Sequence, residues 1–110
     1  MNEQVQRRLV EIPGEVKILA PELSKAQAEY HYLENKKKVI LAVQMGKFEG
    51  SVANREMLAL QSQKYQEHLE KIKLAEVEYI MNKTKLQSLI MGHESCRSLM
   101  SLYKTEANIL

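Results

Sequence analysis

The chain has 110 residues, of which 45% are hydrophobic and 27% charged, and it contains only four glycines and two prolines. This length predicts a single domain, and the scarcity of turn residues argues against a fold of many short strands. The 16 basic and 14 acidic residues give a net charge of +2, which does not by itself indicate a nucleic-acid-binding protein. Composition therefore points to an all-α protein and leaves the function open.

Residues 1–20 are expected to form a short helix over 2–12 followed by a connector over 13–20. A proline inside a helix removes a hydrogen bond and clashes with the preceding turn, so we expect breaks at Pro13 and at Pro21. The first residues contain no apolar stretch typical of a secretory signal, and no later run approaches the roughly 20 apolar residues of a membrane span. The single cysteine, Cys96, excludes an intrachain disulfide. These features predict a cytoplasmic protein.

A first long helix is predicted over about 21–48, with Pro21 as its first residue. Mostly apolar side chains recur there at steps of three and four residues and form one stripe, which consists of Leu23, Ala26, Tyr30, Leu33, Lys37 and Ile40. Gly50 suits the left-handed position after a helix, and Ser51 suits the cap of a helix that begins at Val52. The sequence thus predicts a tight connection between two helices.

A second long helix is predicted over about 52–108, because the only interruption in this segment is the weak one at Gly92. A heptad pattern, typical of a coiled coil, runs through it and consists of Tyr65, His68, Ile72, Ala75, Tyr79, Asn82, Leu86, Leu89, His93, Cys96, Met100 and Tyr103. Residues 21–110 are therefore expected to form a helical hairpin with coiled-coil packing.

The second predicted helix is too long for the first to cover. A helix that begins at Pro21 and folds back at Gly50 reaches only to about residue 80, at about 1.5 Å per residue. Apolar side chains beyond that point need another cover, and a second copy of the chain is the favoured one. The expected assembly is a homo-oligomeric bundle, with a dimer preferred, and its predicted interface consists of Leu86, Leu89, His93, Cys96, Met100 and Tyr103.

No pattern of catalytic or cofactor-binding residues stands out. A carboxylate-bridged di-metal site needs Glu-x-x-His pairs, which the chain lacks. His93 and Cys96 lie three residues apart and make half of a metal site at most, so they are better explained as packed side chains. A glycine-rich phosphate loop is also missing, because Gly46-x-x-x-Gly50 is not followed by Lys-Ser/Thr. We expect no enzymatic activity, no metal and no cofactor.

Basic residues suggest an alternative function, which is binding of nucleic acid through helix faces. Tyr30 and Tyr32, close to a run of three lysines, are suited to stacking on bases. The three lysines point in different directions around a helix, which is more typical of a solvated surface. The candidate nucleic-acid contacts are Lys36, Lys37, Lys38, Lys47 and Arg55.

The segment Ser51-Val52-Ala53-Asn54-Arg55-Glu56, followed by Ser62-x-x-Tyr65, resembles a group of short helical proteins of bacteriophages and prophages. In those proteins, a turn ending in Ser/Thr-Val-Ala-x-Arg-Glu opens the second helix of a hairpin. Arg97-Ser98 is similar to the end of that helix, although Cys96 stands where a tryptophan is usual. The resemblance implies a non-enzymatic accessory role in phage DNA recombination or replication, through binding of a protein partner in the host cytoplasm.

Overall fold

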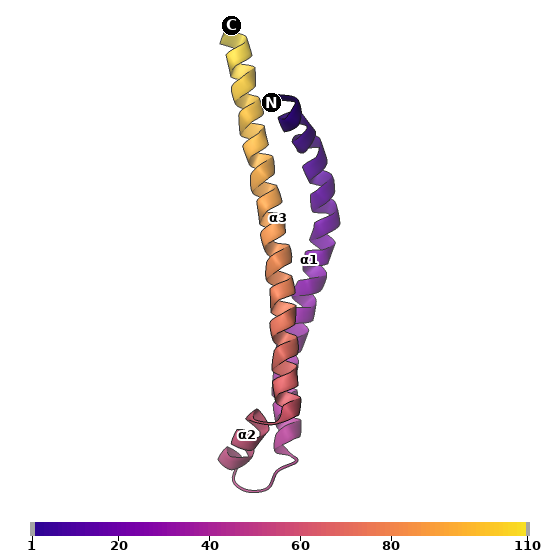
Figure 1. Ribbon diagram of the computed structural model, residues 1–110, viewed down its shortest axis with the longest axis vertical. Helices are drawn as coiled ribbons and strands as arrows, with labels where there is room; N and C mark the ends of the chain where they lie inside the picture. Colours follow the sequence, from indigo (N-terminus) through magenta and orange to yellow (C-terminus); the bar gives the residue numbers. More distant parts are fainter. Residues whose placement is uncertain (1, 110) are drawn as a thin grey trace. The chain divides into compact units, whose positions relative to one another are not determined.

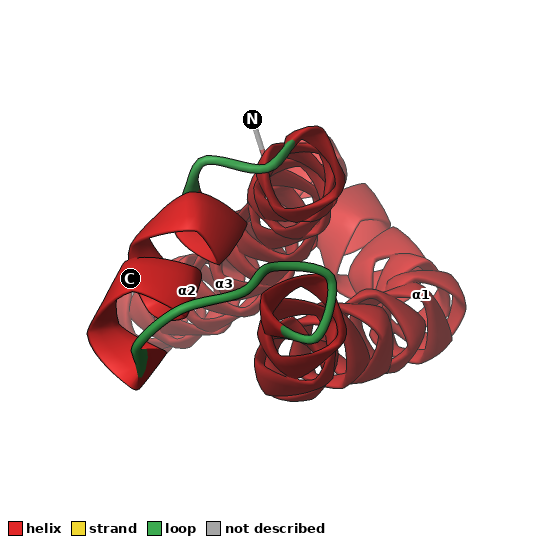
Figure 2. Ribbon diagram, turned by 90° about the horizontal axis from the view of Figure 1, so that it is seen from below, coloured by secondary structure: helices red, strands yellow, loops and turns green. Residues whose placement is uncertain are grey.

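A computed structural model describes residues 2–109 and contains three α-helices. They are α1 (Asn2–Met45), α2 (Val52–Leu60) and α3 (Gln63–Ile109), and the described residues include no strand (Figure 2). The prediction of an all-α fold is confirmed. The predicted hairpin of two helices differs from this arrangement in the start of its first helix and in the continuity of its second.

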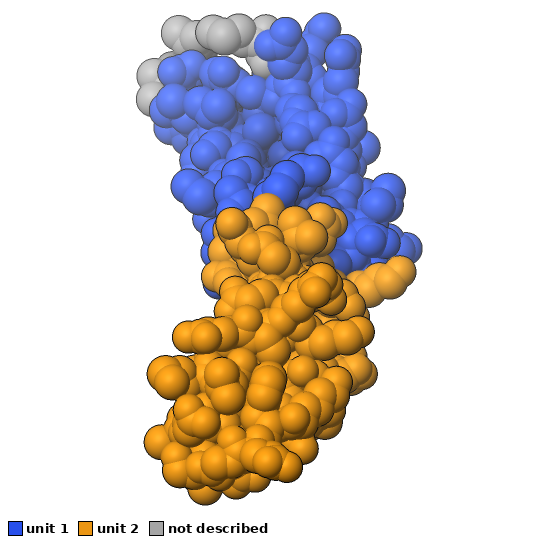
Figure 3. Space-filling model, turned by 60° about the horizontal axis from the view of Figure 1, so that its bottom comes forward, with its two compact units in different colours: residues 1–24, 81–110 blue, residues 25–80 orange. Residues whose placement is uncertain are grey.

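The chain forms two compact units, which are coloured separately in Figure 3. The described part of unit 1 combines residues 2–24 of α1 with residues 81–109 of α3, whereas unit 2 consists of residues 25–80. Each long helix therefore contributes to both units, and α2 belongs to unit 2 alone (Figure 1).

Unit 2 contains most of the buried side chains of the described residues. The heptad pattern of the second predicted helix supplies Tyr65 and Ile72, which are 8% and 6% exposed, and α2 contributes the fully buried Ala59. His68 is 6% exposed, and its Nε2 lies 2.8 Å from the backbone oxygen of Leu33. This hydrogen bond joins α3 to α1 and gives the buried ring a polar partner.

Unit 1 is held together by a continuation of the same stripe toward the N-terminus. Its positions on α1 follow steps of three and four residues, are all buried or half-buried, and consist of Val5, Leu9, Ile12, Val16, Leu19 and Leu23. A Cβ added at Gly92 of α3 would lie 3.9 Å from Ile12 Cδ1, which shows how closely the helices approach there. Ile12, 2% exposed, is the only buried residue among those described in this unit.

The expected connector over 13–20 is wrong, because α1 continues through both Pro13 and Pro21. Both prolines are exposed, so the carbonyls of the preceding turns that lose an intrahelical partner lie close to water. Each proline costs about 3 kcal/mol relative to alanine in a helix interior. Burying the apolar side chains of the stripe contributes roughly 1.5–3 kcal/mol each, which offsets that cost.

The connection after α1 agrees with the sequence prediction at its two central residues. Gly50 has a φ of +117°, and Ser51 is the N-cap of α2, where its side chain accepts a hydrogen bond from the backbone N–H of Asn54 at 3.2 Å. This positive φ favours glycine; an added Cβ would also lie 3.0 Å from Nδ2 of Asn54, the end of a side chain that can move aside.

The predicted continuous helix over 52–108 is wrong at one point, because Gln61 and Ser62 separate α2 from α3. Ser62 Oγ donates to the backbone oxygen of Ala59 at 2.6 Å and accepts from the backbone N–H of Tyr65 at 3.4 Å. The hydroxyl of Ser62 therefore bonds the C-terminal end of α2 and also acts as the N-cap of α3. A serine among helix-forming residues gave no strong signal of this break.

Candidate protein-interaction surface

Unit 1 exposes many large apolar side chains while burying very few. The exposed fractions of seven of these side chains lie between 40% and 80%, and the residues are Val10, Ile18, Met81, Ile90, Met91, Leu99 and Leu102. A pair of helices covers only one side of each member, so such residues have no cover within the pair. This unit is the part of the described chain that most needs a partner.

A groove of about 640 Å³ runs along one side of unit 1 between α1 and α3. It is lined by Arg8, Glu15, Ile18, Leu19, Thr84, Lys85, Ser88 and Leu89. A second groove of about 310 Å³ is lined by Ile12, Pro13, Val16, Ile90, His93, Glu94 and Arg97. Both grooves combine apolar walls with a few charged groups, which suits the side of another helix better than a small polar substrate.

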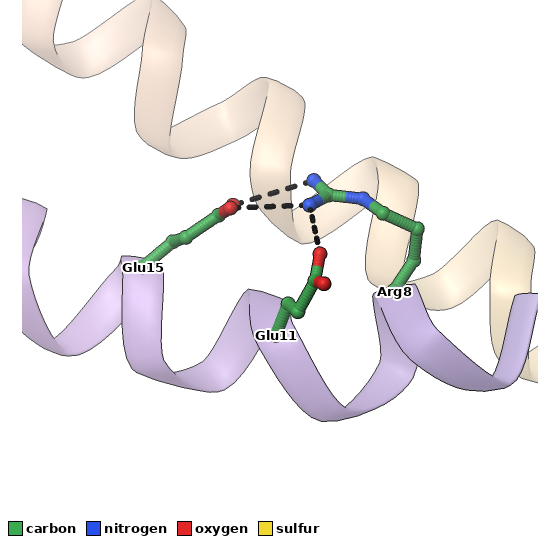
Figure 4. A network of polar contacts seen from close by, with 3 residues as sticks. All are labelled: Arg8, Glu11 and Glu15. Carbon is green, nitrogen blue, oxygen red and sulfur yellow. Dashed lines mark hydrogen bonds and ion pairs between the residues drawn. The ribbon is translucent and has the colours of Figure 1, made fainter. Parts of the chain in front are cut away.

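The rim of the larger groove carries a network of three charged side chains on α1 (Figure 4). Arg8 Nη1 donates to Glu11 Oε2 and to Glu15 Oε1, each at 3.1 Å, and Arg8 Nη2 donates to Glu15 Oε2 at 3.3 Å. Hydrogen bonds to Glu15 and then to Glu11 raise the pKa of the Arg8 guanidinium. The three side chains remain about half exposed, so their ion pairs contribute little to the stability of the fold. Their effect is to hold one another in position at the rim of the groove.

A stripe on α3, on the side opposite its heptad pattern, carries no charged residue at seven successive positions, and two of its members, Thr84 and Ser88, also border the larger groove beside α1. We call this stripe the outer face, and it consists of Met81, Thr84, Ser88, Met91, Ser95, Ser98 and Leu102, which are all exposed. These residues recur at steps of three and four, so they lie in one stripe along the helix. Met81, Met91 and Leu102 are 54%, 69% and 52% exposed. An exposed helix side normally carries charged residues, and their absence here is unusual.

The predicted oligomer interface lies instead on the opposite side of α3. Leu86, Leu89, His93, Cys96, Met100 and Tyr103 are all half-buried within the single chain, because residues 2–24 of α1 lie beside them in unit 1. The argument that α1 is too short to reach them was wrong, since it placed the start of that helix at Pro21. Their role in an oligomer stays a prediction without that support.

The five candidate nucleic-acid contacts belong to unit 2, and two of them make a surface contact within the chain. Lys36 Nζ lies 5.7 Å from the centre of the Tyr32 ring, and Lys37 Nζ lies 3.5 Å from Glu34 Oε2. Lys38 and Lys47 are exposed, whereas Arg55 is half-buried and its Nε is enclosed without a hydrogen-bond partner.

An aromatic cluster in unit 2 uses one of the tyrosines expected to stack on bases. The rings of Tyr30 and Tyr79 are stacked with centroids 5.8 Å apart, and the His31 ring lies 5.6 Å and 6.4 Å from them. Tyr30 also donates to Glu34 Oε1 at 3.4 Å. Burial, followed by the negative charges of Glu76 and Glu34, raises the pKa of the Tyr30 phenol.

Comparisons with models of protein families, with curated proteins and with solved structures found no match to this chain. Among the described residues, no three His, Cys, Asp or Glu side chains converge to form a metal site. None of the described helices is both long and apolar enough to span a membrane. The outer face is the feature that sequence reasoning missed, although its signal, a second uncharged stripe beside the heptad pattern, is present in the sequence.

Proposed function

We propose that the chain is a non-enzymatic helical interaction protein that associates with itself and binds a protein partner. The observation that supports this is the imbalance within unit 1, where Ile12 alone is buried among the described residues and seven large apolar side chains are exposed. Helices of this kind gain most of their stability from tertiary packing. Association with another chain would bury these side chains, each with a gain of up to about 1.5–3 kcal/mol.

The resemblance of residues 51–65 to phage-encoded helical proteins adds an accessory role in phage DNA recombination or replication to this proposal. In such a role the chain would act by contact with another protein. The two grooves of unit 1 offer it surfaces on either side of the helix pair. Nucleic-acid binding is the less favoured function, because the net charge is only +2 and the three lysines at 36–38 point in different directions around α1.

Sedimentation velocity over a concentration series in the micromolar range tests the self-association. We expect a species of twice the chain mass of 12.7 kDa, in a proportion that rises with concentration. A single species of 12.7 kDa throughout the series would contradict the proposal. Fluorescence anisotropy with single- and double-stranded DNA at low salt tests the rival function, since phosphate contacts give binding that weakens steeply as salt is added.

A further inference from the structure

We infer that two copies of the chain pair in antiparallel orientation through the outer face of α3, with the two-fold axis between Leu89 and Ile90. The inference rests on the proposed self-association and assigns it a surface, an orientation and a register. It replaces the predicted interface, whose residues are half-buried against α1 in the single chain. The argument uses the sizes, the charges and the hydroxyl groups of the residues on and beside the outer face.

The sizes of the side chains on the outer face favour the antiparallel orientation. The large residues Met81 and Met91 lie on the same stripe as the small residues Thr84, Ser88, Ser95 and Ser98. In a parallel pair, each residue faces its own copy, so methionine meets methionine and serine meets serine. Reversing one helix places Met81 opposite Ser98 of the partner subunit and Met91 opposite Ser88 of the partner subunit. Large side chains then fill the space that small ones leave.

The charges beside the outer face select the register. With the axis between Leu89 and Ile90, Thr84 lies opposite Ser95 of the partner subunit, and Glu94 lies beside Gln87 of the partner subunit. A shift by one heptad places Met91 opposite Ser95 of the partner subunit and Ser88 opposite Ser98 of the partner subunit, but it brings Glu94 next to Glu94 of the partner subunit. Like charges placed together at an interface repel each other and disfavour association. The register centred between Leu89 and Ile90 avoids this repulsion.

The hydroxyl groups of the outer face allow it to be buried without unsatisfied polar atoms. A serine or threonine in a helix can donate to the backbone oxygen four residues earlier. Thr105 of α3 already does so, with its Oγ1 3.0 Å from the backbone oxygen of Ser101. The same local bond is open to Thr84, Ser88, Ser95 and Ser98 in an interface. A charged side chain has no such local partner and would be costly to bury, and the outer face contains no charged residue.

Disulfide cross-linking tests the pairing. The double variant Thr84→Cys/Ser95→Cys, made in a Cys96→Ser background, places each cysteine opposite the other kind in the partner. The two positions are 11 residues apart on one helix, or about 16 Å, so a disulfide between them must join two chains. After oxidation, we expect most of the double variant to run as a covalent dimer on a non-reducing gel. Each single variant should remain a monomer on the same gel, as should the exposed control Lys104→Cys.

Each other outcome overturns part of the inference. Covalent dimers of the single variants would show a parallel pair, and dimers of Ser88→Cys/Ser98→Cys in place of Thr84→Cys/Ser95→Cys would show the shifted register. A dimer in sedimentation with no cross-linking on the outer face would overturn this inference and leave the proposed self-association standing. A wild-type chain that sediments only as a monomer would overturn both.

Discussion

Ionisation of the Tyr30 phenol is expected to lower the stability of unit 2. Its ring stacks on Tyr79, and burial and the nearby carboxylates of Glu76 and Glu34 raise its pKa above the ordinary 10.0. A group whose pKa is raised on folding gives its full contribution to stability below its unfolded pKa. That contribution is lost as the pH rises through the folded value. Tyr30 therefore makes the chain sensitive to alkali.

We expect Tyr30→Phe to lose less stability than the wild-type chain as the pH is raised above about 10, because the phenol that resists ionisation in the folded state is gone. Thermal unfolding followed by circular dichroism at a series of alkaline pH values measures the difference. Tyr32→Phe serves as the control, since Tyr32 is 58% exposed. Equal alkaline losses in wild type and Tyr30→Phe would contradict the assignment.

His68 joins α3 to α1 at the centre of unit 2. We expect His68→Ala to lower the free energy of unfolding by about 2–3 kcal/mol, because the variant loses the hydrogen bond to the Leu33 backbone oxygen and leaves a cavity. Urea unfolding at one protein concentration measures this loss. The exposed neighbour Lys71→Ala should change the value by less than about 0.5 kcal/mol. Similar effects of the two substitutions would show that the His68 contact contributes little.

Among the elements, α1 shows where local signals and tertiary packing conflict. The stripe from Leu23 to Ile40 was readable because its spacing and its helix propensity agree. The residues before Pro21 follow the same spacing, but two prolines obscure it. Local penalties are visible in a sequence, whereas the packing that outweighs them involves residues of α3 from 81 onward, far from the prolines along the chain. The break at Ser62 was also missed, because serine can either continue a helix or cap one, and only the structure shows that its hydroxyl bonds the end of α2 and the start of α3.

The two prolines of α1 provide a direct test of its continuity. We expect Pro13→Ala and Pro21→Ala each to raise the free energy of unfolding, by up to about 3 kcal/mol, because alanine restores a backbone hydrogen bond inside the helix. Gly14→Ala should add about 1 kcal/mol, since nothing lies within 4 Å of its added Cβ. Chemical denaturation measures all three variants. A loss of stability in both proline variants would favour the connector predicted from the sequence.

At the scale of the whole molecule, the two sides of α3 have different roles. Leu89 faces α1 and is half-buried in unit 1, whereas Met91 lies on the outer face and is 69% exposed. A charge at Leu89 would therefore damage the fold of the single chain. A charge at Met91 would leave the fold intact and act on the association of two chains. Sequence periodicity identified the first side, but only the placement of α1 shows that the second is uncovered.

Light scattering of Met91→Glu beside the wild-type chain tests the central claim, which is that the chain self-associates through the outer face. We expect the wild type to have twice the mass of the variant, because the new carboxylate would be buried without a partner at the interface. Helix content should be the same in both. The control Val10→Glu, at a side chain 80% exposed on α1, should keep the wild-type mass. Equal masses for wild type and Met91→Glu would contradict the claim.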